Sequence, residues 1–153
     1  MWAPRGVRPI VKVEHRYEWL YLYAFACPQT GESQYWLLPE VTTAAFQAVL
    51  DAFARSVGAS EDRPVLLVLD GAGWHVSKDL RVPDGIILVF LPPYSPELQP
   101  AEHLWALTDA PLKNKHFASL ADLECLLAER CAQLERLPDL VYAHTHFHWW
   151  PSY

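Results

Sequence analysis

Asp70 is the first residue in this chain whose type and position could support chemistry. It directly follows Val65–Leu69, a short apolar run typical of a strand buried on both faces. Ligands bind beyond the carboxyl ends of strands in open α/β sheets, so a carboxylate at this point could contact a ligand. The small residues Gly71–Gly73 leave space around it. The plainer alternative is that Asp70 only opens a turn or caps a following helix.

Glu102 is the second candidate, and it follows a proline-rich segment. The prolines within Leu91–Pro100 restrict the backbone and lower the entropy of the unfolded chain. Such a stiff loop can fix the start of the next helix, which we expect over Pro100–Leu107. Glu102 lies in its first turn, where the helix dipole favours a carboxylate, and Trp105 and Ala106 are expected to face the core. Taken alone, Glu102 could equally be a residue that merely stabilises the first turn.

The other segments supply elements that would position these two acids. Aromatic and apolar runs predict strands, and an apolar spacing of three to four residues predicts helices. The expected strands are Tyr17–Cys27, Gln34–Leu38, Val65–Leu69 and Ile86–Leu91. The expected helices include one from Thr42 that ends at Gly58, and a last one that begins at Ser119 with Asp122 in a capping box. Together they indicate an α/β fold whose parallel strands are joined through helices.

The composition narrows the classes of function. The length of 153 residues fits one domain, and a hydrophobic content of 52% is enough to bury a core, which argues against disorder. The formal net charge of −6 argues against binding nucleic acid by bulk charge. It does not exclude a metal-dependent nuclease, whose carboxylates hold cations near phosphate. No apolar run approaches the roughly 18 residues that span a bilayer, so no membrane association is expected.

The cysteines point to a reducing compartment. Cys27, Cys125 and Cys131 are scattered and form no CxxC pair. We expect them to be reduced, buried thiols in a cytosolic protein rather than members of a disulfide or a zinc site.

Two segments taken together are far more specific than either acid alone. LVLDGAGWH contains Asp70, and LPPYSPELQPAEHLW contains Glu102. They resemble the segments around the second and third acidic residues of DDE transposases, in the mariner-like superfamily and its bacterial insertion-sequence relatives. Similar segments lie at residues 2–9, 16–23, 111–117 and 146–150, so the resemblance covers essentially the whole chain. It implies a ribonuclease H-like fold, a mixed sheet flanked by helices.

The resemblance also implies a reaction, which is phosphoryl transfer on DNA with Mg²⁺ or Mn²⁺. In this chemistry one ion activates water or a DNA 3′-hydroxyl and the other stabilises the leaving oxygen. Hard cations prefer oxygen ligands, so Asp70 and Glu102 become the expected catalytic and metal-binding residues. The implied partner is DNA, at transposon ends and target sites, and no small-molecule cofactor is expected.

The chain departs from the family pattern in two ways. Gly71 and Gln99 stand where the family commonly has Asn. The more serious departure is that the family's first catalytic Asp lies on a central first strand, upstream of the segment matching residues 2–9. We therefore expect a sheet without that strand, with unprotected edges on Tyr17–Cys27 and Val65–Leu69 that invite pairing with another chain, such as a homodimer. An incomplete metal shell would slow the reaction by about 10²–10⁴-fold, so we expect the chain to be inactive alone.

Three further residues are candidates for contact with DNA. His75 matches a Trp-His pair that follows the second motif in the family, and it could orient water or contact the DNA backbone. Lys113 and Lys115 form a compact basic cluster with a plausible role at the DNA backbone. The alternatives are an ordinary loop histidine and a solvated basic loop.

A separate histidine pattern lies near the C-terminus. His144, His146 and His148 alternate as residues on one face of a strand do, and could hold a transition metal. The family likeness of this tail favours a structural segment instead.

The leading interpretation is thus the partial catalytic domain of a DDE transposase over residues 1–153, located in the bacterial cytoplasm and at the nucleoid when it acts. Two alternatives stay open. One is a decayed or domesticated remnant that only binds DNA or a protein partner. The other is an intact enzyme whose gene product starts upstream.

Overall fold

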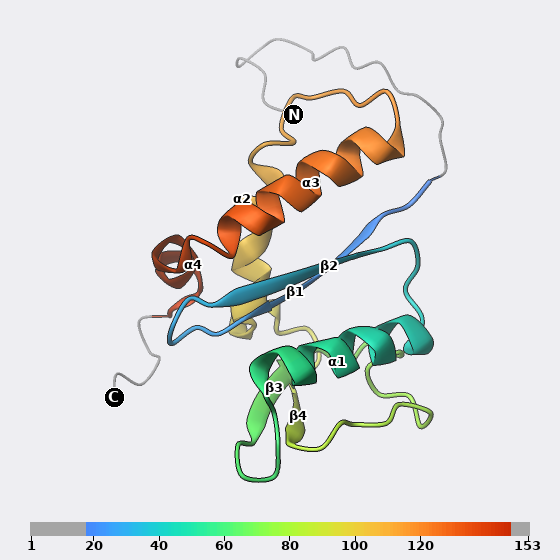
Figure 1. The fold of residues 1–153 in the computed structure, drawn as a ribbon, viewed down its shortest axis with the longest axis vertical. Coiled ribbons are helices and arrows are strands. Elements are labelled where there is room, and N and C mark those ends of the chain that lie inside the picture. Colours follow the sequence, from blue (N-terminus) through green and yellow to red (C-terminus); the bar gives the residue numbers. More distant parts are fainter. Residues whose placement is uncertain (1–17, 148–153) are drawn as a thin grey trace.

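A β-hairpin lies between a group of C-terminal helices on one side and a helix with two further strands on the other (Figure 1). The computed structural model describes residues 18–147. In the hairpin, β1 (Tyr21–Ala26) pairs antiparallel with β2 (Ser33–Leu38). Both predicted strands are confirmed, although the first is shorter than expected. The segment at residues 2–9 that resembles the family lies outside the described residues.

The two faces of the hairpin pack against different partners, because side chains alternate along each strand. One face carries Tyr23, Phe25 and Trp36, which pack in a core with α1 and the other strands. The opposite face carries Ala24 and Tyr35, which pack against the C-terminal helices. The hairpin is therefore covered on both faces, which explains its apolar and aromatic composition.

The helix α1 (Thr43–Val57) is placed as the sequence predicts. The side chain of Thr42 caps it by accepting a hydrogen bond from the backbone N–H of Ala45. Gly58 ends it with a left-handed backbone (φ 64°), a conformation that glycine adopts without steric cost. Its apolar stripe, from Phe46 to Ala54, is buried in the core.

The second pair of strands is parallel, as predicted. β3 (Val65–Leu69) pairs with β4 (Ile86–Phe90) in register from Val65 opposite Ile86 to Leu69 opposite Phe90. Contrary to the expectation of helical connections, residues 70–85 between them form turns and irregular backbone. The glycines near Asp70 and the proline before Asp84 disfavour a helix there.

The predicted single mixed sheet is not what residues 18–147 form. Within that range β1 pairs with β2 and β3 with β4, in two separate two-stranded sheets. Side chains of α1, Phe46 among them, pack with residues of both sheets in one core. One long edge of β1 and one of β3 thus carry no strand from the described part of the chain. The predicted absence of a central strand stays a prediction.

The C-terminal elements cover the other face of the hairpin (Figure 1). They share a second core, which contains the fully buried Leu104, Leu134 and Val141. The elements are η1 (Pro96–Leu98), η2 (Pro100–Leu104), α2 (Trp105–Asp109), α3 (Leu120–Leu134) and α4 (Pro138–Thr145). The capping box predicted at Ser119 and Asp122 is confirmed. α3 is not the last helix, because α4 follows it.

The described residues also bear on two further predictions, which concern membrane spans and the cysteines. Among residues 18–147 no helix is long and apolar enough to cross a membrane. The three cysteines are free thiols, but only Cys131 is buried; Cys27 is partly buried, and Cys125 is exposed on α3. The expectation of three buried thiols was wrong for Cys125, which lies on the solvent side of that helix.

Candidate active site

Asp70 lies directly after the carboxyl end of β3, as the sequence predicts. Its side chain is 59% exposed. Oδ1 accepts a hydrogen bond from the backbone N–H of Ala72 at 3.2 Å, which turns the chain away from the strand. The carboxylate is therefore both held at one oxygen and open to solvent.

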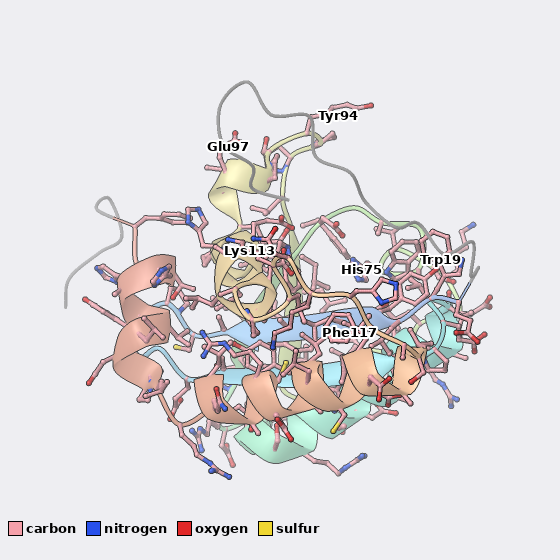
Figure 2. The ribbon with its side chains drawn as sticks, turned by 90° about the horizontal axis from the view of Figure 1, so that it is seen from above. Trp19, His75, Tyr94, Glu97, Lys113 and Phe117 are labelled. Carbon is pink, nitrogen blue, oxygen red and sulfur yellow. The ribbon has the colours of Figure 1, made fainter. Side chains whose placement is uncertain are left out.

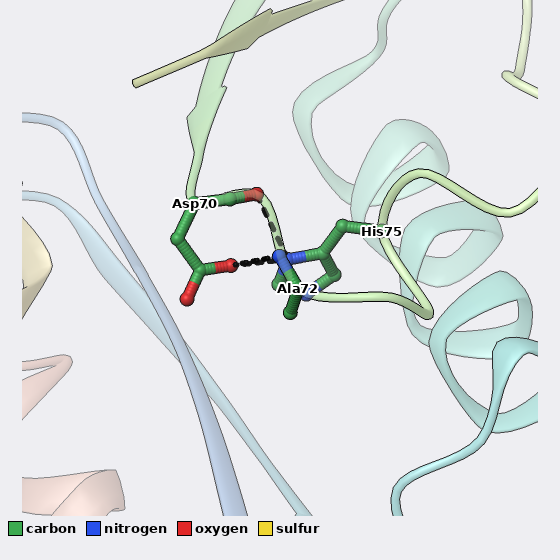
Figure 3. Close-up of polar contacts among 3 residues, drawn as sticks. All are labelled: Asp70, Ala72 and His75. Carbon is green, nitrogen blue, oxygen red and sulfur yellow. Dashed lines mark hydrogen bonds and ion pairs between the residues drawn. The ribbon is translucent and has the colours of Figure 1, made fainter. Parts of the chain in front are cut away.

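His75 makes the closest contact to this carboxylate. Its Nδ1 lies 2.6 Å from Oδ1 of Asp70 and 3.4 Å from the main-chain oxygen of the same residue (Figure 3). The His75 side chain is only 11% exposed. This placement is unfavourable for the DNA-backbone contact predicted for His75, since a phosphate needs an accessible donor and Nδ1 already faces Asp70.

Aromatic rings surround His75 on its other sides. The ring centroid of Phe46 lies 4.4 Å from that of His75, and the rings of Trp74 and Tyr23 lie at 5.7 and 6.5 Å. Tyr23 belongs to β1, so the hairpin passes beside Asp70 (Figure 3). Burial, and secondarily the nearby charge of Asp70, raises the pKa of the Tyr23 hydroxyl.

Glu102 lies in the first turn after the proline-rich segment, also as predicted. It is exposed, and its Oε2 accepts a hydrogen bond from Nε1 of Trp105 at 3.0 Å. The expectation that Trp105 and Ala106 face the core was wrong: Leu104 and Leu107 do so, while Trp105 is half-buried and Ala106 exposed. The cause is that η2 has three residues per turn rather than 3.6, which rotates the following residues around the axis.

Within residues 18–147 each acid has its own hydrogen-bonded neighbours, and the two acids share none of them. Within residues 18–147 no group of three or more His, Cys, Asp and Glu residues could hold a metal. The donor chemistry nevertheless fits a hard divalent cation, because both carboxylates are exposed oxygen ligands. In the described hydrogen bonds, Oδ2 of Asp70 and Oε1 of Glu102 take no part.

The predicted basic residues lie on the loop between α2 and α3. Lys113 and Lys115 are both exposed, and Lys113 is labelled in Figure 2. A turn shapes this loop: the backbone N–H of Lys115 donates to the carbonyl of Leu112, and Asn114 has a positive φ of 61°. Their ammonium groups are thus free to meet solvent or a polyanion.

Among the C-terminal histidines, His144 and His146 are described, and each bonds a different main-chain oxygen. His144 is in helix α4 and its Nδ1 bonds the main-chain oxygen of Leu140 at 2.9 Å. His146 follows the helix and its Nδ1 bonds the oxygen of Pro28 at 3.0 Å. The strand-like alternation was the wrong interpretation for His144, which lies in the last turn of a helix; His148 lies outside the described residues.

Comparison with known proteins decides the family. Residues 1–124 match the profile of the DDE superfamily endonucleases. The chain belongs to this family. A protein of Sinorhizobium fredii titled "Uncharacterized protein y4pE/y4sA" is 39% identical over 122 residues, which cover 79% of this chain and 87% of that protein. No solved structure gives a significant match.

Membership of the DDE superfamily endonucleases gives the site its context. The matched residues 1–124 include both Asp70 and Glu102. Endonucleases of this superfamily act on DNA with divalent metals, and their fold is ribonuclease H-like. Asp70 and Glu102 stay predicted site residues, and their contacts with His75 and Trp105 were not predicted from the sequence. Spacings of five and three residues along the chain were the available signals.

Proposed function

We propose that this DDE superfamily endonuclease is a transposase catalytic core, in which Asp70 and Glu102 hold Mg²⁺ or Mn²⁺ for cleavage and transfer of DNA strands. The observation that carries the proposal is the state of the two carboxylates. Each is exposed, each has one oxygen fixed by a neighbouring donor, and each leaves the other oxygen outside the described hydrogen bonds. In each carboxylate the other oxygen is therefore available to a cation.

The residues of the chain would position the cations. Bound cations would supply activation of the attacking oxygen and stabilisation of the leaving oxygen. Asp70, at the rigid end of β3, and Glu102, after a segment stiffened by prolines, would fix where those cations lie relative to a DNA phosphate. Two carboxylates complete only part of a coordination shell, so we expect the chain alone to be inactive in transposition, with a residual nicking rate about 10²–10⁴-fold below that of a complete site.

Lys113 and Lys115 support binding of the DNA backbone. Both ammonium groups are exposed on one loop, and each phosphate contact of this kind adds to affinity and to its dependence on salt. We expect the protein to act on DNA in the bacterial cytoplasm, at the nucleoid, and to pair with a second copy.

Nicking of supercoiled plasmid DNA tests the proposed function. The wild type, Asp70→Asn and Glu102→Gln are incubated with increasing Mn²⁺. Glu97→Gln is the matched control, since Glu97 is an exposed acid in the neighbouring η1 (Figure 2). We expect slow, Mn²⁺-dependent nicking by the wild type and the control, and its loss in the other two variants.

The possible outcomes separate the parts of the proposal. Nicking that persists in Asp70→Asn and Glu102→Gln would contradict the assigned site. Fast nicking that both substitutions abolish would support the site but contradict the expected weakness. Reading the nucleotides upstream of the first codon then shows whether an in-frame strand ending in Asp exists.

A non-catalytic remnant that binds DNA or a protein partner is the second candidate. The observation that favours it is that residues 18–147 contain no cluster of three or more potential metal ligands. A complete lack of nicking at all Mn²⁺ concentrations, together with salt-dependent DNA binding that Lys113→Ala weakens, would favour this candidate.

A further inference from the structure

Both polar contacts of the His75 ring are with one residue, Asp70. Both atoms that face its Nδ1, Oδ1 of Asp70 at 2.6 Å and the main-chain oxygen of Asp70 at 3.4 Å, are hydrogen-bond acceptors. Nδ1 must therefore carry the hydrogen and donate it. Among the described residues no other hydrogen bond of this side chain is found.

The opposite side of the ring is closed to solvent. Nε2 of His75 is buried and has no hydrogen-bond partner among the described residues. The rings of Phe46, Trp74 and Tyr23 enclose it. A buried nitrogen without a partner costs free energy, so the site retains a histidine at some expense where an apolar ring would fit.

We propose that His75 is a positioning residue, which holds the Asp70 carboxylate in the orientation that a divalent cation requires. This inference rests on the proposed function of Asp70. The aromatic cage fixes the imidazole, and the imidazole fixes Oδ1 together with the backbone N–H of Ala72. With two donors on Oδ1, the rotation of the carboxylate about its last bond is set, and Oδ2 is presented outward.

The surrounding aromatic rings explain why a buried histidine can hold the Asp70 carboxylate in place. Asp70 itself is 59% exposed and follows a strand end, so without a fixed donor its carboxylate would sample several rotamers. A histidine that contacted DNA or a cation directly would need its Nε2 accessible, and here Nε2 is buried. His75 therefore acts through Asp70.

Binding of Mn²⁺ alone, followed by the electron paramagnetic resonance signal of the free ion, tests the inference without an activity assay. The variants are His75→Phe, which fills the cage but has no donor, and His75→Asn, whose amide nitrogen can take the place of Nδ1. Loss of an outer-shell partner typically weakens metal binding by about 10–100-fold. We expect a loss in this range for His75→Phe and substantial rescue in His75→Asn, with melting temperatures at or above that of the wild type for His75→Phe.

Asp70→Asn separates this inference from the function on which it rests. If Asp70→Asn loses Mn²⁺ binding but His75→Phe binds as the wild type does, the positioning role is wrong and the metal site stands. If Asp70→Asn also binds as the wild type does, the proposed metal site itself is wrong.

A second measurement uses only the wild-type chain, so it does not depend on whether a variant folds. Nitrogen chemical shifts of His75 in the wild-type chain, without metal and with Mg²⁺, report which ring nitrogen carries the hydrogen. The inference expects the hydrogen on Nδ1 in both conditions. A hydrogen on Nε2 with a bare Nδ1 would overturn it, whatever the outcome of the metal titration.

Discussion

The indole Nε1 of Trp105 donates to Oε2 of Glu102 at 3.0 Å, so the tryptophan three residues after Glu102 restrains this acid. The short 3₁₀ turn η2 creates this contact because residues three apart lie above one another there. Glu102 thus resembles Asp70 in having one carboxylate oxygen fixed by an aromatic side chain that follows it in sequence.

Substitution of Trp105 by Phe removes the donor and keeps most of the ring. A net hydrogen bond is worth about 0.5–1.5 kcal/mol, so we expect about a 2–13-fold loss of Mn²⁺ affinity. Metal titration measures this loss, and Trp19→Phe is the control because Trp19 is 67% exposed and remote in sequence. Equal affinities for Trp105→Phe and the control would show that the contact does not matter.

Gly31 should tolerate no side chain. It has φ 75°, and a Cβ there would lie 2.0 Å from the main-chain oxygen of Pro138 at the start of α4. The Gly31→Ala substitution should therefore lower the free energy of unfolding by more than the about 1 kcal/mol that is typical of single substitutions. Urea denaturation measures the change, with Gly73→Ala as the control, since a Cβ at Gly73 meets nothing within 4 Å. A Gly31→Ala protein as stable as the control would contradict the packing of the hairpin turn on α4.

Cys131 should react slowly with alkylating reagents, in contrast to Cys125. Burial, and then the charge of Glu135, raises the pKa of the Cys131 thiol to about 11. At pH 8 the thiol is protonated and covered, whereas Cys125 is exposed. Mass spectrometry after a short exposure to iodoacetamide should find Cys125 modified first. Faster modification of Cys131 would contradict its burial.

The same raised pKa has a consequence for stability at alkaline pH. The unfolded chain loses the Cys131 proton near the ordinary pKa of 9.0, while the folded chain holds it to about 11. Below pH 9 the folded and unfolded states bind the proton equally. Above pH 9 loss of the proton stabilises the unfolded state relative to the folded state. The free energy of unfolding should thus fall between about pH 9 and pH 11, and less so in Cys131→Ala.

Local patterns predicted most of the elements, because their signals lie within a few residues. The amphipathic spacing from Thr42 and the predicted C-cap at Gly58 placed α1 to within a residue. The apolar run before Asp70 placed β3 and its parallel pairing with β4. The motif around Glu102 placed the second acid, although the 3₁₀ turn altered which of its neighbours face the core.

The contacts that shape the site were not predictable in the same way. The cage around His75 combines Tyr23 from β1, Phe46 from α1 and Trp74 from the loop after β3. Such contacts depend on how distant segments pack, which no local spacing encodes. The separation into two sheets is likewise a property of tertiary packing, since each strand was identified correctly by itself.

The most direct measurement of the central claim is a double-mutant cycle on Mn²⁺ binding. It compares the wild type, Asp70→Asn, Glu102→Gln and the double variant, with Glu97→Gln as the control. If both carboxylates hold the same cation, each single substitution weakens binding strongly and the second then adds less than its separate effect. Mn²⁺ affinities that stay at the wild-type value in both single variants would contradict the claim that Asp70 and Glu102 form a metal site.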